Sequence, residues 1–162
     1  MKTLLGFLCL FFITAALGQT QQLPDAALND IFITQDNSEI TFEQILAQEK
    51  GNYVFIDIWS SWCGSCYIKL SEVKKLQKMR PDISYVFLSV EGSQIRWKQV
   101  LEKLTIEGQH YYMSSYLQGA FAKSIDLKQI PRYLLFDPSG KLVSLDASNL
   151  SINQINALLY EN

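Results

Sequence analysis

Two cysteines separated by two residues, Cys63 and Cys66, are the side chains in this sequence best suited to chemistry. A thiolate attacks a disulfide through a mixed-disulfide intermediate, and a second thiol nearby can resolve that intermediate. A spacing of two residues lets the sulfurs meet without unwinding a helix. We therefore expect Cys63 to be the nucleophile and Cys66 the resolving thiol of a redox-active disulfide.

The predicted elements around this pair favour such chemistry. Residues 53–59 are β-branched, aromatic or apolar except for Asp57, which is the pattern of a strand buried on both faces. Residues 67–80 read as an amphipathic helix, so the cysteines lie between strand and helix N-terminus. Unpaired N–H groups and the helix dipole at such a terminus can lower the pKa of a thiol. The predicted inner face of the helix consists of Ile68, Val73, Leu76 and Met79.

Three stretches carry a resemblance to a known family. Residues 55–66 read F-I-D-I-W-S-S-W-C-G-S-C, residues 96–112 read R-W-K-Q-V-L-E-K-L-T-I-E-G-Q-H-Y-Y, and residues 129–140 read Q-I-P-R-Y-L-L-F-D-P-S-G. In combination they resemble the thioredoxin superfamily, and more closely its secreted TlpA/ResA-like thiol:disulfide oxidoreductases of the Bacteroidetes type. The resemblance covers nearly all of the chain after residue 25. It implies an α/β thioredoxin fold, with a mixed central sheet, helices on both faces, and an additional N-terminal β-hairpin and helix.

The resemblance also implies a substrate site beside the cysteines. Pro131 stands where the family has a cis-proline that faces the cysteine pair, and the backbone of Ile130 is then expected to pair with an extended substrate. Trp62 is expected on the same substrate-binding surface. Gly64 and Ser65 replace the Gly-Pro dipeptide of thioredoxin. We expect a reductase of protein disulfides, and a disulfide oxidase or isomerase is the alternative.

Two acidic residues are candidates for moving protons. Asp57 lies six residues before Cys63, at the position of the buried aspartate of thioredoxin. Burial without a partner raises a carboxyl pKa above about 3.9, so we expect Asp57 to accept the proton of Cys66; the alternative is that the strand exposes it. Glu91 follows a second buried strand, residues 83–90, that should end at the same sheet edge. Glu91 is expected either to take part in proton handling or to be an exposed turn carboxylate.

Local signals place the remaining elements. Capping boxes, in which Ser or Thr precedes Gln by three residues, mark helix starts at Thr41 and Ser151. The Asp-Pro-Ser-Gly sequence of residues 137–140 predicts a hairpin turn. In chain order we expect strands at 30–34 and 39–41, a helix at 41–49, helices at 94–104 and from Ser114 or Ser115 to 124, strands at 132–136 and 141–145, and a helix from 151 onward.

The first residues indicate export. Residues 1–18 combine a positive start, an apolar run and a small-x-small cleavage site, which is typical of a secretory signal peptide. Cys9 lies in this apolar run and is interpreted as incidental. We expect residues 19–29 to form a flexible arm and residues 30–162 to form the thioredoxin-like domain. The mature protein would then be periplasmic or secreted, without stable membrane insertion; an N-terminal anchor facing the periplasm is the alternative.

Composition limits the partners. The chain has 162 residues, 48% of them hydrophobic, and a net charge of −2, which offers no electrostatic basis for binding nucleic acid. His110 is the only histidine, so a structural imidazole is favoured over a metal ligand. No dissociable cofactor is implied. Electrons for a reductase would come from another protein, a membrane thiol donor, because an oxidising compartment has no thiol pool to supply them.

Three other classes compete with the redox interpretation. A peroxidase of the peroxiredoxin type would need Thr-x-x-Cys, but Ser60 stands at the threonine position. A Sco-like copper chaperone would be expected to have C-x-x-x-C and a matched histidine. A noncatalytic interaction module would retain its biological role after Cys63→Ser.

Overall fold

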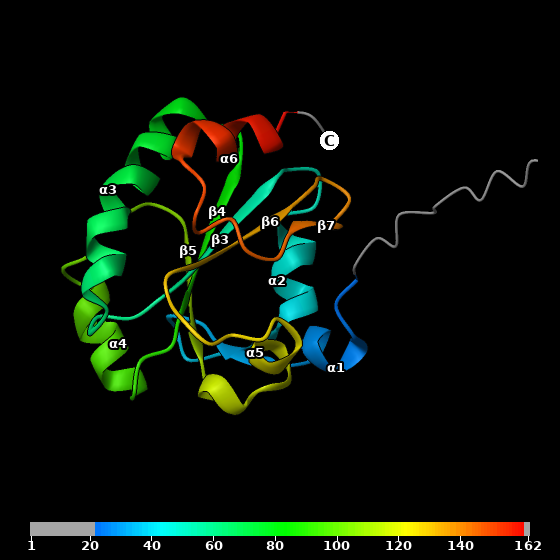
Figure 1. Ribbon diagram of the computed structural model, residues 1–162. Helices are drawn as coiled ribbons and strands as arrows, with labels where there is room; N and C mark the ends of the chain where they lie inside the picture. The colour runs from blue at the N-terminus through cyan, green and yellow to red at the C-terminus, as the bar shows by residue number, and fades with distance from the viewer. Residues whose placement is uncertain (1–21, 161–162) are drawn as a thin grey trace, which may run out of the picture.

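The structure, a computed structural model, describes residues 22–160 as a seven-stranded mixed sheet between two layers of helices (Figure 1). The strand order is β2-β1-β5-β4-β3-β6-β7. The strands are β1 (Ile31–Ile33), β2 (Glu39–Thr41), β3 (Val54–Trp59), β4 (Ser84–Ser89), β5 (Gln109–Met113), β6 (Arg132–Phe136) and β7 (Leu142–Ser144). The predicted fold class, including the N-terminal hairpin and helix, is confirmed.

Helices cover both faces of the sheet (Figure 1). They are α1 (Asp25–Leu28), α2 (Phe42–Gln48), α3 (Gly64–Met79), α4 (Gln94–Leu101), α5 (Ala120–Ser124) and α6 (Ile152–Leu158), with a 3-10 helix η1 (Tyr116–Gln118). Alternate residues of β3 pack against the helices on opposite faces of the sheet. Ile56 belongs to a hydrophobic cluster with Phe42 of α2, and Phe55 belongs to a cluster with Val73 of α3. Burial on both faces explains the continuous apolar pattern of β3.

The strand register brings the predicted site residues to one edge. β3 and β4 are parallel, with Trp59 opposite Ser89, so both strands end at the same edge of the sheet. β6 runs antiparallel to β3, with Asp57 opposite Tyr133. The cysteine turn after β3, Glu91 after β4 and Pro131 before β6 therefore meet there.

Two helix starts and one turn form as the sequence predicts. Thr41 Oγ1 accepts the Gln44 N–H at 3.2 Å, and Gln44 Oε1 accepts the Thr41 N–H at 2.9 Å. Ser151 and Gln154 make the same reciprocal pair at the start of α6. Asp137 organises the β6–β7 turn, because its Oδ1 accepts the backbone N–H groups of Ser139 and Lys141.

The predicted inner face of the helix after the cysteines was partly wrong. Val73 and Leu76 are fully buried, but 75% of Ile68 and 47% of Met79 are exposed. The buried stripe of α3 instead begins at Cys66. Ile68 lies two residues beyond the buried Cys66, about 200° around the helix axis, and therefore faces solvent.

The predicted flexible arm is also wrong over residues 25–28, which form α1. Ala27 is fully buried in the cluster that contains Phe42 and Phe121. The signal-peptide segment, residues 1–18 with Cys9, lies outside the described residues. Between residues 22 and 160, no helix is both long and apolar enough to cross a membrane.

The helix predicted from Ser114 or Ser115 is divided into η1 and α5. Neither serine caps α5; its Phe121 N–H is accepted by Asp30 Oδ2 at 2.9 Å, from a segment far away in sequence. Ser115 Oγ donates to Asp30 Oδ1 at 3.3 Å. A side chain at Gly119 would collide with the Asp30 carboxylate, so this tertiary contact sets the local structure.

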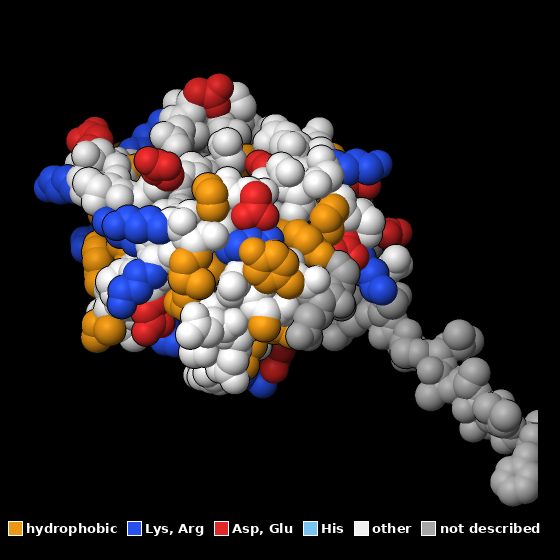
Figure 2. Space-filling model, turned by 90° about the horizontal axis from the view of Figure 1, so that it is seen from above, with side chains coloured by type: hydrophobic (Ala, Val, Ile, Leu, Met, Phe, Trp, Pro, Cys, Tyr) orange, Lys and Arg blue, Asp and Glu red, His pale blue; other side chains and the backbone are white. Residues whose placement is uncertain are grey.

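The surface at the α6 end of the molecule carries no uniform charge. Figure 2 looks onto the side where α6 and the C-terminal end of α3 lie, and Lys and Arg side chains alternate there with Asp and Glu. Arg80 near this end is paired with Asp82 at 2.8 Å. This face therefore has the mixed charge of an ordinary solvated surface.

Candidate active site

The cysteine pair forms a disulfide where β3 gives way to α3. Cys63 is the N-cap residue of α3, and its Sγ accepts the Cys66 N–H at 3.1 Å. Both cysteines are about 5% exposed. Because a helix N-terminus leaves N–H groups without intrahelical partners, a negative charge on the Cys63 sulfur would be stabilised at this place.

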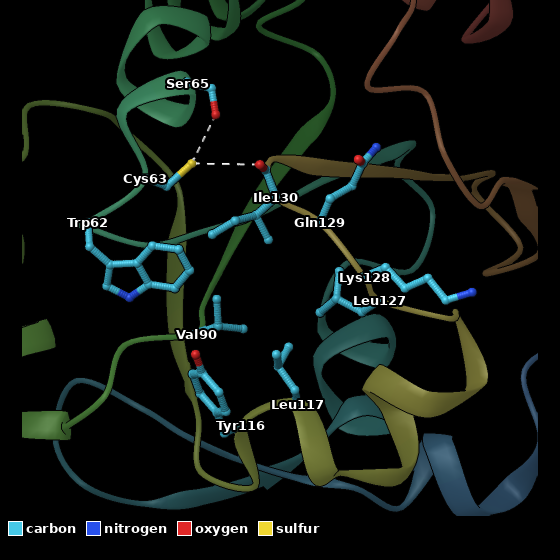
Figure 3. Close-up of a pocket in the computed structure, with 10 residues that line it drawn as sticks. All are labelled: Trp62, Cys63, Ser65, Val90, Tyr116, Leu117, Leu127, Lys128, Gln129 and Ile130. Atoms are coloured by element: carbon cyan, nitrogen blue, oxygen red, sulfur yellow. Dashed lines mark hydrogen bonds between the residues drawn. The ribbon is translucent and has the colours of Figure 1, made fainter.

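Two more polar groups lie against the Cys63 sulfur (Figure 3). The Ser65 hydroxyl is 3.3 Å from Sγ and the Ile130 carbonyl oxygen is 3.8 Å from it. In the reduced protein the Ser65 hydroxyl and the Cys66 N–H can both donate to a Cys63 thiolate, which favours the charged form. The role of Ser65 was not predicted from the sequence.

Ile130 and Pro131 are joined by a cis peptide bond, as the resemblance implies. The Ile130 carbonyl faces the Cys63 sulfur, and the indole of Trp62 lies below the sulfur in this view, near the Ile130 side chain, with 56% of the residue exposed (Figure 3). The structure thus gathers Trp62, Ile130 and Pro131 around the nucleophile. Their substrate-binding role stays a prediction.

Asp57 is buried within the sheet, with 2% of the residue exposed. Side chains two residues apart in a strand share a face, and the neighbours Phe55 and Trp59 pack in the cluster that contains Cys66. Burial raises the pKa of Asp57 to about 8. Its Oδ1 has no hydrogen-bond partner among the described residues. The predicted burial is confirmed, and a carboxyl with this pKa can exchange a proton near neutral pH.

Tyr133 faces Asp57 from the neighbouring strand. The two residues are directly opposite in the β3–β6 register. Burial raises the pKa of Tyr133, and the Asp57 charge raises it further. The buried Tyr133 hydroxyl has no hydrogen-bond partner among residues 22–160. Tyr133, directly opposite Asp57, therefore does not offset a negative charge on the carboxyl.

Glu91 is buried but well supplied with partners, so the alternative of an exposed turn carboxylate is wrong. Its Oε1 accepts the Ser60 hydroxyl at 2.6 Å and also the Ser61 N–H. Its Oε2 lies 3.5 Å from Arg96 Nε. Burial alone would raise the pKa of Glu91, but these hydrogen bonds and the Arg96 charge hold that pKa below its usual value. Proton handling stays a prediction, and the contacts favour a carboxylate that fixes the turn before the cysteines.

His110 lies in the core. Its ring stacks on Phe87 with centroids 4.9 Å apart, and its Nε2 is 3.3 Å from the Ile106 carbonyl oxygen. Burial lowers the pKa of His110. Within residues 22–160 no three or more His, Cys, Asp or Glu side chains are grouped in a way that could hold a metal ion.

A cysteine pair at a strand-to-helix junction, facing a cis-proline, defines a redox site of the thioredoxin type. In agreement, a family model described as thioredoxin-like matches residues 51–142, more than half of the chain. The chain belongs to this family, and the predicted superfamily is confirmed. The matched region contains both cysteines, Asp57 and Pro131.

One sequence relative extends the comparison. An uncharacterized protein of Haemophilus influenzae is 36% identical over 76 residues, which are 47% of this chain and 43% of that protein. The match thus spans less than half the length of that relative.

Solved structures match most of the described chain. The solution structure of a candidate thiol-disulfide oxidoreductase from Bacteroides vulgatus matches with a TM-score of 0.66 and 26% identity, over 81% of this chain and 84% of that one. An exposed lipoprotein thioredoxin from Streptococcus pneumoniae matches with a TM-score of 0.65 and 20% identity, over 82% of this chain and 98% of that one. A secreted disulfide oxidoreductase from Mycobacterium tuberculosis, homologous to E. coli DsbE, matches with a TM-score of 0.61 and 12% identity, over 85% of this chain and 98% of that one. The last two share the fold, and the first, at 26% identity, also agrees with the predicted class of thiol:disulfide oxidoreductases.

Proposed function

We propose that this protein is a thiol:disulfide oxidoreductase that reduces disulfides of protein substrates in the cell envelope. One observation carries the proposal: the Cys63–Cys66 disulfide lies at the N-terminus of α3, with the Cys63 sulfur facing the Ile130 carbonyl. A thiolate formed at this position meets both helix N–H groups and an accessible backbone edge.

The reaction begins with the reduced protein. The Cys63 thiolate attacks one sulfur of the substrate disulfide, so a Cys63–substrate disulfide forms and the other substrate sulfur leaves as a thiolate. Cys66 then loses its proton and attacks the Cys63 sulfur. The second substrate thiolate leaves, the Cys63–Cys66 disulfide forms, and two electrons have passed from the protein to the substrate.

Asp57 is the proton acceptor in the second step. With a pKa raised to about 8, it is largely protonated at pH 7. It therefore needs to be in its minor ionised form, or to pass its own proton on, before it accepts the proton of Cys66. General-base assistance of this kind contributes about 10²- to 10⁴-fold to a rate.

The oxidised protein must be reduced again. A membrane protein with a thiol pair would supply two electrons by the same exchange, run in reverse at Cys63. The envelope location is supported by the apolar N-terminal segment and by relatives described as secreted or as an exposed lipoprotein.

Trapping with single-cysteine variants tests the proposal. With Cys66→Ser, a disulfide-containing model protein should accumulate as a mixed disulfide with Cys63, because the resolving thiol is missing. The matched variant Cys63→Ser should trap nothing. Equal trapping by both variants, or by neither, would contradict the assigned roles.

A further inference from the structure

A tyrosine side chain lies buried beside Asp57, and no step of the proposed reaction uses its hydroxyl. Tyr133 of β6 is 1% exposed and stands directly opposite Asp57 in the β3–β6 register. Residues directly opposite on neighbouring strands project from the same face of a sheet, and Tyr133 packs in the same hydrophobic cluster as Cys66. The Tyr133 side chain therefore shares one layer with the carboxyl and the resolving thiol.

The polar atoms of this pair lack partners. Neither Asp57 Oδ1 nor the Tyr133 hydroxyl has a hydrogen-bond partner among residues 22–160. On its other side Asp57 is opposite Phe87 of β4, whose ring is apolar. A buried polar atom that stays unpaired costs free energy. Two such atoms on opposite residues of neighbouring strands favour a contact with each other, made directly or through one water molecule.

Tyr133 is fixed by contacts that do not involve its hydroxyl. Its backbone N–H donates to the Ser148 hydroxyl at 2.8 Å, and its carbonyl oxygen accepts the Ala147 N–H at 2.9 Å. Its ring packs against the ring of Phe55, with centroids 4.9 Å apart. The packing of the residue thus explains the ring and leaves the hydroxyl without a structural reason.

Tyr133 also borders charged residues at the edge of α3. The Lys69 Nζ lies 6.0 Å from the centre of the Tyr133 ring and donates to the Ser148 carbonyl oxygen at 2.5 Å. Burial raises the pKa of Tyr133, and the charges of Asp57 and Glu72 raise it further. Lys69 and Glu72 are both half-buried. Tyr133 therefore lies between a buried carboxyl and a charged edge of the helix that meets water.

Other titratable side chains of the neighbouring elements are engaged elsewhere. Tyr85 of β4 donates its hydroxyl to the Arg80 carbonyl oxygen at 3.0 Å. Asp146, in the segment after β7, is paired with Arg132 at 3.2 Å. β7 and α6, both within the described chain, contain no titratable side chain. The titratable groups of β3 and α3 that adjoin Tyr133 are Asp57, Cys66, Lys69 and Glu72.

We propose that the Tyr133 hydroxyl returns the proton of Asp57 to solvent, so that Asp57 can accept the proton of Cys66 during resolution. The proposal rests on the proposed function. Tyr133 is a relay that acts through Asp57 and is not itself a catalytic residue.

The relay moves two protons and no electrons. The protonated Asp57 carboxyl gives its proton to the Tyr133 oxygen, directly or through one water molecule, while the Tyr133 O–H proton passes to water at the edge of α3. A separate phenolate is disfavoured, because burial raises the pKa of Tyr133, so the two transfers occur together. Asp57 is left ionised and Tyr133 neutral. Cys66 then gives its proton to Asp57 and attacks the Cys63 sulfur.

Tyr133→Phe removes only the hydroxyl and tests the relay. The reduced protein is mixed with a peptide disulfide, and resolution of the mixed disulfide is followed by rapid quench at pH 7 and pH 9. At pH 7 resolution should slow by about tenfold or more, because only roughly a tenth of Asp57 is already ionised one pH unit below its pKa of about 8. At pH 9 Asp57 is mostly ionised, so the variant and the wild type should agree within about twofold. An unchanged rate at pH 7, or the same slowing at both pH values, would overturn the proposal.

Two further variants locate the effect. Tyr85→Phe removes another buried tyrosine hydroxyl from the same cluster, and it should leave the resolution rate unchanged at both pH values. In an Asp57→Asn background Tyr133→Phe should cause no further slowing, because the relay has no proton to move. If Tyr133→Phe slows resolution in that background as much as in the wild type, the hydroxyl does not act through Asp57 and the proposal is wrong.

Failure of the relay can be told apart from failure of the proposed function. A wild-type protein that does not reduce the peptide disulfide would contradict the proposed function itself. Wild-type reduction together with an unaffected Tyr133→Phe would reject only the relay. Denaturant unfolding should show Tyr133→Phe to be no less stable than the wild type, because the hydroxyl has no hydrogen-bond partner among residues 22–160. A loss of stability combined with slowing at both pH values would indicate a structural role and overturn the relay.

Discussion

Asp57 and Glu91 are two carboxyl groups at the same edge of one sheet, both almost completely buried, yet their surroundings differ in kind. Asp57 Oδ1 has no hydrogen-bond partner among residues 22–160, and burial raises the pKa of Asp57 to about 8. Glu91 accepts two hydrogen bonds from the turn before the cysteines and pairs with Arg96, and its pKa is lowered. Partners, rather than burial, decide which carboxyl stays charged. The first can exchange protons near neutral pH; the second is suited to holding the turn.

The largest expected effect separates the two steps of disulfide exchange. Asp57→Asn should slow resolution of the mixed disulfide by about 10²- to 10⁴-fold, because the general base is lost, while the first attack by Cys63 changes little. Rapid-quench kinetics with a peptide disulfide measures both steps. Glu91→Gln is the matched control and should leave the ratio of the two rates near its wild-type value. Equal slowing of both steps by Asp57→Asn would remove Asp57 from the reaction.

The next effect concerns stability, and the two carboxyl groups should act with opposite sign. Glu91→Ala leaves the Ser60 hydroxyl and the Ser61 N–H buried without their acceptor and should lower the free energy of unfolding by about 2–4 kcal/mol. Asp57→Asn removes a carboxyl that is disfavoured by burial and should raise it by about 1–3 kcal/mol at pH 7. Denaturant unfolding measures both values.

Arg96→Met is the control for the stability effect. Arg96 is 62% exposed, so its loss should cost only about 0–1 kcal/mol. A loss of stability in Asp57→Asn as large as that in Glu91→Ala would contradict the difference between the two sites.

Asp57 and Glu91 should each contribute to the pH dependence of the free energy of unfolding. The folded pKa of Asp57 is raised, so the folded state keeps a proton that the unfolded state has lost between about pH 4 and 8. Stability should therefore fall with rising pH in this window, by at most about 1.4 kcal/mol per pH unit from this residue, and Asp57→Asn should remove that slope. The contribution of Glu91, with a lowered pKa, is present above its unfolded pKa and is lost only as the pH falls through its folded pKa. A wild-type slope that survives in Asp57→Asn would contradict the assignment.

The smallest effect is expected at Ser65. Its hydroxyl lies 3.3 Å from the Cys63 sulfur, and one hydrogen bond to a charged group is lost in Ser65→Ala. The rate of alkylation of reduced Cys63 at pH 7 should fall about two- to tenfold. Ser71→Ala is a control, because its hydroxyl donates to the Ile68 carbonyl on the exposed side of α3. An unchanged rate in Ser65→Ala would show that helix N–H groups alone stabilise the thiolate.

Features set by neighbouring residues could be predicted from the sequence, whereas contacts between residues far apart in sequence could not. The strand with Asp57, the capping boxes at Thr41 and Ser151, and the cysteine pair follow from patterns within a few residues, and all were placed correctly. Pro131 was placed by resemblance. The partners of Glu91 come from a turn about thirty residues earlier in the chain, so burial with compensation was not visible in the sequence.

The wrong predictions for α3 and for the segment after Ser114 arose where tertiary contacts, rather than local sequence, decide the structure. Ile68 was assigned to the inner face of α3 on its apolar character, but the buried stripe of the helix consists of Cys66, Val73 and Leu76, and Ile68 lies outside it. One helix was predicted from Ser114 or Ser115 to residue 124, but the segment forms η1 and α5 instead, and Asp30 accepts hydrogen bonds from the Ser115 hydroxyl and the Phe121 N–H.

The reduction potential of the Cys63–Cys66 couple tests the central claim most directly. The purified protein is equilibrated with glutathione or dithiothreitol buffers, and the oxidised fraction is measured after acid trapping. We expect a value near or below about −230 mV, towards the range of thioredoxin, which suits a reductase supplied by a dedicated donor. A value above about −180 mV would contradict the reductase assignment and indicate an oxidase or isomerase, and a pair that forms no disulfide under any buffer would contradict redox function altogether.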